Sequence, residues 1–421
     1  MCEGDRGPGA RSRPLAKLLL VVALGTLGCS EPPRSASGSA DRESEAALDW
    51  SLAEDYRVGG VSASGPLAFG DVAAVAFGPD GHLYVIDADA NHVVVIDRAG
   101  RLVRTLGESG EGPGSLAWPT GLVVYDDGEV VVLDSARRRW VRFGPEGDVL
   151  DGVPLADDAA PPRGPLALDA SGRVVGTRDD DVEGTGPRLV RLHLVRSSVE
   201  VDPVTLWSGW RPITPEAREL TPEETGGLRV RLPPLVGFHP HVHAAPLPDG
   251  RSVVSDSTDY RLRVLDPSGA ILDEIRMDAS GTTVTEAHRE AEKERRRAAL
   301  EIDPPAAMIS NSDGQTMGAP DDPIRRLELA RIDAMGFHDR IPVIAALAVE
   351  PEGRLWVGRS GASPGDLGPI DVFSADLELI GTLPPGAVAF PAALGADDLV
   401  AHVTHDDFGA PIVHVSRWVR R

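Results

Sequence analysis

The sequence predicts an all-β fold in which four-stranded antiparallel sheets close into a ring, the architecture of a six-bladed β-propeller. Three observations predict it. Short runs of β-branched and other apolar residues are separated by turn residues along most of the 421-residue chain. The 46 glycines and 36 prolines favour many turns over long helices. One pattern of turns and acidic residues recurs at a constant spacing.

The repeated unit is clearest in three stretches that end at Gly100, Gly147 and Gly269. Each stretch opens with an Asp-Gly turn nineteen residues before its closing glycine. Asp-Gly permits a positive φ and favours a tight hairpin, so the strands on either side pair antiparallel. With one strand before and one after, each unit becomes a four-stranded meander. Both of its faces are apolar, and closing a ring of such sheets buries them.

Weaker copies complete the ring. Two have their turns at Gly172 and Gly353, and the last reads FPAALGADDLVAHVT followed by PIVHVSRWV. The last copy supplies only three strands. The segment Trp50–Val58 reads as a strand without a local partner, so we predict that it closes the last blade. The blades are then expected to begin near residues 72, 119, 163, 239, 341 and 387.

Two insertions interrupt the repeat, at residues 207–238 and 278–340. The second predicts a helix over Thr285–Glu301, with Thr283 and Glu286 as a capping box, and a second helix over Ile324–Met335. Both insertions connect the outer strand of one blade to the inner strand of the next. We expect them on one face of the ring, together with the loops that follow the second strands.

Four segments carry a resemblance to a known family: Gly107–Gly114, Tyr260–Leu262, Val284–Ala287 and Gly353–Val357. In this order they resemble the bacterial six-bladed β-propeller lipoproteins, which are relatives of the NHL-repeat propellers. The resemblance covers about residues 48–421. Blade three departs from it, because Arg178 stands where the other copies have aspartate. The resemblance implies the fold and leaves the activity open.

The first residues predict export. A basic segment precedes the apolar stretch Leu18–Leu27, which is too short to span a bilayer. The stretch ends in Thr26-Leu27-Gly28-Cys29, which resembles a lipobox. We therefore expect residues 1–28 to be a lipoprotein signal peptide and Cys29 to take the lipid. The alternative is an ordinary signal peptide that is cleaved nearby.

The residues after Cys29 predict the anchoring. Residues 29–47 are rich in Ser, Pro, Ala and charge, which predicts a flexible tether before a propeller at 48–421. Ser30 follows the cysteine. In a Gram-negative cell the absence of aspartate there favours the outer membrane. We expect membrane contact through the N-terminal lipid only.

Charge and cysteine content exclude several functions. The net charge is −23, from 65 acidic and 42 basic residues. Nucleic acid is therefore not expected as a partner, because a phosphate backbone binds a basic surface. Both cysteines, Cys2 and Cys29, precede the expected propeller. Thiolate metal sites and cysteine nucleophiles are thereby excluded from it.

The cluster His239, His241 and His243 is expected to begin the inner strand of blade four, which lines the channel. Residues two apart on a strand point the same way, and imidazole is a ligand of zinc. One strand cannot complete a metal site, so His338 and Arg340 are the candidates to complete this one. The alternative is a set of polar channel residues that bind water.

Three further acids recur six residues after the first glycine of each clear repeat. Repetition gives these acids similar surroundings, whereas paired-carboxylate catalysis needs unlike surroundings. An aspartate at a strand end accepts hydrogen bonds from turn N–H groups. We therefore expect structural roles for Asp87, Asp134 and Asp256.

Three functions remain open, and the sequence by itself requires no cofactor. The first is a module that binds an envelope protein, peptide or glycan, with Trp118 available to stack on a ligand; the alternative role for Trp118 is blade packing. The second is a metal-dependent lyase or lactonase that uses the histidines, with zinc as the expected metal. The third is a scaffold without a small ligand. The first and the third are favoured over an enzyme because the sequence contains no complete catalytic constellation and no nucleophile motif.

Overall fold

The computed structural model describes residues 47–155, 161–178, 188–192, 204–209, 218–221, 230–232, 235–256, 258–302, 323–363 and 365–420. The predicted signal peptide, Cys29 and the tether up to residue 46 lie outside the described residues. Glu45–Arg421 form one compact unit that contains every described strand and helix.

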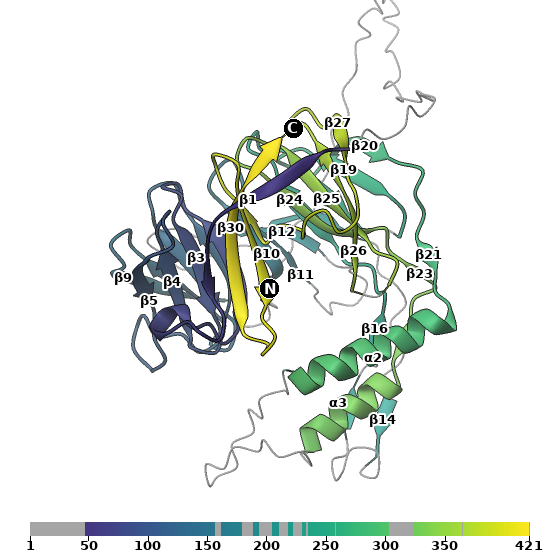
Figure 1. Cartoon of the computed structure of the whole chain (residues 1–421), viewed down its shortest axis with the longest axis horizontal. Coiled ribbons are helices and arrows are strands. Elements are labelled where there is room, and N and C mark those ends of the chain that lie inside the picture. Colours follow the sequence, from purple (N-terminus) through teal and green to yellow (C-terminus); the bar gives the residue numbers. More distant parts are fainter. Residues whose placement is uncertain are drawn as a thin grey trace, which may run out of the picture. The chain divides into compact units, whose positions relative to one another are not determined.

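Six separate four-stranded antiparallel sheets confirm the predicted six-bladed β-propeller (Figure 1). In each of the first three blades the strands follow the chain order from the inner to the outer strand. Blade one contains β2 (Val72–Phe77), β3 (Leu83–Asp87), β4 (His92–Ile96) and β5 (Leu102–Leu106). Blade two contains β6 (Pro119–Val124), β7 (Val130–Asp134), β8 (Arg139–Phe143) and β9 (Val149–Pro154). Blade three contains β10 (Arg163–Leu168), β11 (Val174–Arg178), β12 (Arg188–Leu192) and β13 (Val204–Ser208).

The fourth and fifth blades have the same order, and the sixth combines three strands from the C-terminal end of the described chain with one from its N-terminal end. Blade four contains β17 (His243–Pro246), β18 (Ser252–Ser255), β19 (Arg261–Leu265) and β20 (Ile271–Arg276). Blade five contains β24 (Ile344–Val349), β25 (Leu355–Ser360), β26 (Leu367–Phe373) and β27 (Leu379–Leu383). Blade six contains β28 (Ala393–Leu394), β29 (Leu399–His405), β30 (Pro411–Arg420) and β1 (Trp50–Gly59).

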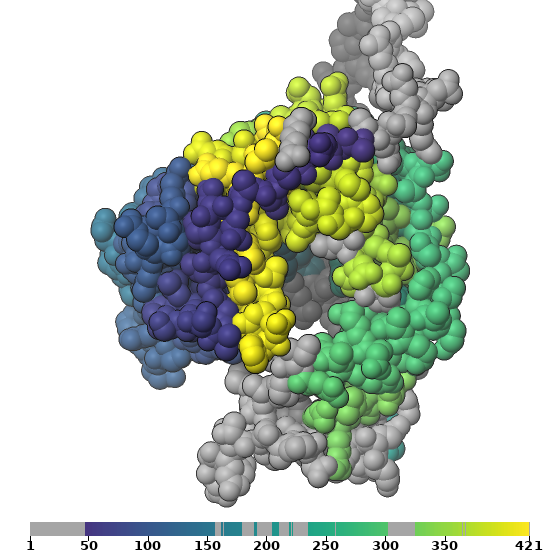
Figure 2. All heavy atoms as spheres, viewed as in Figure 1, coloured from purple at the N-terminus to yellow at the C-terminus, as the bar shows by residue number. Residues whose placement is uncertain are grey.

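The predicted closure of the ring by the N-terminal strand is confirmed. β1 pairs antiparallel with β30 from Trp50 opposite Arg420 to Gly59 opposite Ile412. Figure 2 shows the purple first strand lying along the yellow last strand. Trp356 of blade five stacks on Trp418 at 4.6 Å between ring centroids, and Trp50 packs edge-on against Trp356 at 5.9 Å. The closure is therefore held by side chains as well as by backbone hydrogen bonds.

The core is divided among the gaps between neighbouring blades. Leu83 and Val85 of blade one, for example, are fully buried against Val413 and Val415 of blade six. Similar apolar clusters fill the other gaps. Each fully buried Val or Leu contributes about 1.5–3 kcal/mol, so the stacked blades hold the ring closed.

The insertions contain short strands and two helices. β14 (Arg218–Leu220) pairs with β15 (Val230–Leu232), and β21 (Thr282–Thr283) pairs with β23 (Arg340–Ile341). β16 (Val236–Gly237) of the first insertion pairs in parallel with β22 (Gly336–Phe337) of the second. The helices are α2 (Glu286–Ile302) and α3 (Pro323–Asp333), and a short 3-10 helix, η1, spans Gly65–Leu67. Across the described residues, no helix combines the length and apolar character needed to cross a bilayer.

Two predicted details of the insertions are wrong. Trp207 belongs to outer strand β13, where it pairs with Leu189, so the first insertion begins after blade three is complete. Thr283 is paired in β21 and does not cap the helix. Thr285 caps α2 instead: its hydroxyl accepts the N–H of His288 at 3.4 Å, and His288 Nδ1 accepts the N–H of Thr285 at 3.2 Å. Histidine therefore takes the place of glutamate in a reciprocal cap.

Candidate functional site

One face of the propeller carries both insertions, and we call it the insertion face. Val72, at the start of the inner strand of blade one, lies opposite Asp87, at the end of the second strand. Pro119 and Asp134 are related in the same way in blade two. The loops after the second strands therefore share a face with the connections between blades. Both insertions are connections of this kind.

Asp87 and Asp134 are buried at this face and tie loops to inner strands. The Asp87 carboxylate accepts the N–H groups of Gly70 at 3.1 Å, Asp71 at 3.3 Å and Ala90 at 3.3 Å. Asp134 accepts the N–H groups of Trp118 at 3.2 Å and Arg137 at 3.4 Å. Each carboxylate therefore joins the entry of its inner strand to the loop after its second strand.

Asp256 has different partners from the other two acids. It is nearly buried and forms an ion pair with Arg263 on the neighbouring strand β19. The Arg263 guanidinium also lies 3.4 Å from Glu274 and 5.3 Å from the ring centroid of Trp207. The carboxylate of blade four thus takes part in a charge network within its own blade.

Trp118 is presented to solvent at the insertion face, with 51% of its surface exposed. Its N–H donates to Asp134, and its carbonyl accepts the N–H of Ser135 at 2.9 Å. The backbone of this exposed indole is therefore held on both sides, as stacking on a ligand requires.

The histidine cluster is not a single strand, because β17 begins only at His243. Phe238 has a φ of 58°, and it separates β16 from the segment that leads into blade four. The rings of His239 and His241 lie 5.7 Å apart at 49°. Burial lowers the pKa of His243 to about 4, and the charge of His241 adds to this effect. His243 is therefore neutral at neutral pH.

The two residues expected to complete the histidine site lie on the second insertion. His338 donates its N–H to the carbonyl of Gly237 at 3.0 Å, and its Nδ1 lies 3.1 Å from the carbonyl oxygen of Arg340. The Arg340 guanidinium lies 3.4 Å from Asp259. Within the described ranges, no three His, Cys, Asp or Glu side chains are grouped so that they could hold a metal ion. The histidines are therefore not arranged as the expected metal centre.

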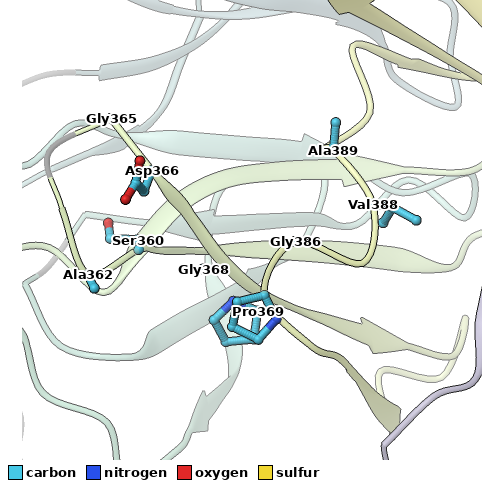
Figure 3. A pocket seen from close by; sticks show the side chains of 11 residues that line it. Ser360, Ala362, Gly365, Asp366, Gly368, Pro369, Gly386, Val388 and Ala389 are labelled. Atoms are coloured by element: carbon cyan, nitrogen blue, oxygen red, sulfur yellow. The ribbon is translucent and has the colours of Figure 1, made fainter.

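A pocket of about 630 Å³ opens in blade five, and the sequence prediction missed it (Figure 3). One wall is the loop between β25 and β26, and the other is the connection from β27 to blade six. The longer loop after the second strand and the Pro-Pro-Gly run that follows β27 are the sequence signals that could have indicated it. Most lining residues are small and apolar, and the full set is Ser360, Gly361, Ala362, Gly365, Asp366, Gly368, Pro369, Pro385, Gly386, Val388 and Ala389.

Helix α2 reaches the edge of this pocket through Arg295. A Cβ atom added to Gly365 would lie only 2.9 Å from Arg295 Cδ, so the helix packs closely on the loop. Glu292 holds Arg295 at 2.7 Å and Arg296 at 2.6 Å. Burial alone raises the pKa of Glu292, but hydrogen bonds from both arginines outweigh burial and leave that pKa lowered. The ionised cluster therefore fixes a cationic side chain beside the pocket.

No family model matches the sequence, and no curated protein matches it. Solved structures resemble it at low identity. A Bacteroides fragilis protein described as exported is 10% identical, with a TM-score of 0.47, covering 89% of this chain and 97% of that chain. Virginiamycin B lyase from Staphylococcus aureus is 12% identical, with a TM-score of 0.40 and coverages of 87% and 99%. A gluconolactonase from Xanthomonas campestris is 14% identical, with a TM-score of 0.37 and coverages of 81% and 85%. At these identities the likeness concerns the fold alone.

Proposed function

We propose that this chain is an exported, lipid-anchored propeller of the cell envelope that binds a peptide, glycan or protein on its insertion face. The observation that carries this proposal is the pocket beside α2 in blade five. The six blades close without either insertion, so the insertions are not needed to complete the ring. Their role is then to build a binding surface over blades four and five.

The surface around the pocket suits binding. The second insertion pairs with the first through β16 and β22 and contacts the pocket loop through Arg295. The pocket volume of about 630 Å³ lies in the range of ligand sites, and its small apolar lining suits an apolar group of a partner. Arg295 and Asp366 supply charges at the same place. A metal-dependent lyase or lactonase gains no comparable support, because the described histidines form no three-ligand set.

A site-specific photo-crosslinker tests the binding proposal. We expect a benzophenone side chain at Ala389, which lines the pocket, to capture a defined partner in intact cells. The matched control is the same group at Ala375, an exposed residue in the turn between β26 and β27, on the opposite face. Equal capture at both positions, or none at Ala389, would contradict a binding role for the pocket.

The proposed lipid anchoring is tested separately. The lipobox-like Thr26-Leu27-Gly28-Cys29, the resemblance to propeller lipoproteins and the serine at position 30 support lipid anchoring in the outer membrane. We expect Cys29→Ala to abolish incorporation of labelled palmitate and to remove the protein from the membrane fraction, whereas Cys2→Ala changes neither. Labelling that survives Cys29→Ala would show that this cysteine is not the lipidated residue.

A further inference from the structure

The loop between β29 and β30 presents the most exposed large apolar side chain among the described residues. Phe408 is 81% exposed, and Val61, on the neighbouring connection from β1, is 64% exposed. Both loops lie on the insertion face, because one follows the second strand of blade six and the other joins two blades. Phenylalanine is among the residue types that are enriched at protein–protein interfaces.

The tip that carries Phe408 is rigid. The Asp406 carboxylate accepts the N–H groups of Phe408 at 2.9 Å and Ala410 at 2.9 Å. It also accepts the N–H of Val61 at 2.7 Å, which ties the two loops together. We call Val61, Asp406 and Phe408 the blade-six tip. Because its backbone is already ordered, burying Phe408 in a partner costs little further conformational entropy.

The pocket in blade five complements this tip. It lies on the same face and one blade away, and its walls are mostly glycine, alanine, proline and valine. The volume of about 630 Å³ admits an aromatic ring. The tip is acidic, with Asp406 and Asp407. At the pocket, Arg295 lies at the edge with 47% of its side chain exposed, and Asp366 is part of the lining. Size and apolar character therefore agree, and Arg295 is the group that can pair with the acidic tip.

We infer that the pocket receives the Phe408 side chain of a second copy of this chain. Knob and pocket lie on the same face, so a two-fold axis makes both contacts at once and the assembly closes as a dimer. This inference rests on the proposed binding function and names the partner of the same pocket. A lipid surface is the less favoured occupant, because the carboxylates of Asp406 and Asp407 beside Phe408 oppose entry into anionic lipid.

Sedimentation equilibrium of the chain from Ser30 onward tests the dimer, since the compact unit Glu45–Arg421 lies entirely within it. We expect a concentration-dependent dimer. Phe408→Ser removes the knob and Ala389→Trp fills the pocket, and each should raise the dimer dissociation constant at least about thirtyfold, as for loss of an interface anchor. Leu379→Ser is the control, because it removes another exposed apolar side chain outside the tip and the pocket.

Mixing the two variants gives a sharper result. A heterodimer of Phe408→Ser and Ala389→Trp keeps one intact knob and one open pocket, so dimer should return in the mixture and in neither variant alone. A monomer at all concentrations, a dimer that either variant leaves unchanged, or no recovery on mixing would overturn the inference. Binding to phosphatidylethanolamine and phosphatidylglycerol vesicles that Phe408→Ser abolishes would assign the tip to membrane and also overturn it. Capture of another partner at Ala389 by a monomer would leave the binding function standing and reject self-association.

Discussion

Blades two and five are built from the same repeat but shape the insertion face differently. Six residues after the turn glycine, blade two has Asp134 and blade five has Arg359. The two residues occupy equivalent positions, opposite the first residue of the inner strand, Pro119 or Ile344. Asp134 caps the loop that follows it, whereas Arg359 binds Asp371 on the next strand through two 2.7 Å contacts.

The difference shows how one register position controls a loop. In blade two the buried carboxylate binds backbone N–H groups, and the chain returns directly in β8. In blade five the guanidinium turns into the sheet, where Thr382 also donates to Asp371 at 2.7 Å. The loop before β26 is longer, and it forms one wall of the pocket. Exchange of an acid for a base thus accompanies the change from a capped loop to a binding wall.

The largest expected effect comes from breaking the pair in blade five. Arg359→Ala leaves the fully buried Asp371 carboxylate with only the Thr382 hydroxyl among the contacts described above. We expect the free energy of unfolding in denaturant to fall by about 3–5 kcal/mol, because an unpaired buried charge is strongly destabilising. The double variant with Asp371→Ala should recover part of this loss. Equal stability of the single variant and the wild type would contradict the role of the pair.

Blade four combines features of blades two and five, and it predicts that the free energy of unfolding depends on pH. Its acid Asp256 pairs with Arg263, and its inner strand begins with the partly buried His243. The pKa of His243 falls from 6.5 to about 4 on folding, so the unfolded chain binds more protons between these pH values. The stability that neutral His243 allows is therefore fully present above about pH 6.5. We expect the free energy of unfolding to fall by about 3 kcal/mol as the pH falls towards 4.

The free energy of unfolding in urea, measured as a function of pH, tests this expectation. His243→Gln should flatten the slope between pH 6.5 and 4, whereas the exposed His241→Gln should leave most of it. A profile that His243→Gln leaves unchanged would show that another group titrates in this window.

A smaller effect is expected from removing the cap in blade two. Asp134→Ala leaves the N–H groups of Trp118 and Arg137 without their acceptor. We expect a loss of about 2 kcal/mol in the free energy of unfolding, since unsatisfied donors near the surface regain water only in part. Asp87→Ala should have a similar effect, because its carboxylate binds the equivalent backbone groups in blade one, the N–H groups of Asp71 and Ala90. Losses below about 0.5 kcal/mol in both would rule out a capping contribution.

Much of the architecture followed from local patterns. Asp-Gly turns and β-branched runs predicted the blades, and the unpaired strand near Trp50 predicted the closure that β1 makes with β30. The helix expected at 285–301 is α2 at Glu286–Ile302. The blades and the helix depend on neighbours in the chain, where turn chemistry and hydrophobic periodicity act directly, whereas the closure followed from counting strands in the repeats.

The candidate site was less accessible to such reasoning. Spacing alone placed His239, His241 and His243 on one strand. In the structure, Gly237 pairs with the distant Phe337 in a separate short sheet, and the inner strand of blade four begins only at His243. The pocket brings together the loop of Gly365 and the connection of Ala389, and the long loop and the Pro-Pro-Gly run indicate turns without indicating a pocket. Tertiary packing decided both outcomes, including the contact of the distant Arg295 with the pocket loop.

The repeat, the number of blades and the first helix could be predicted from local turn and hydrophobic patterns, and the closing strand could be predicted because the last repeat lacks a fourth strand. Only the tertiary structure decided that Arg359 turns inward, that Arg295 stands beside the pocket, and that Phe408 and the pocket share one face. Those outcomes depend on how stacked sheets orient side chains far apart in the chain. No local periodicity records that orientation.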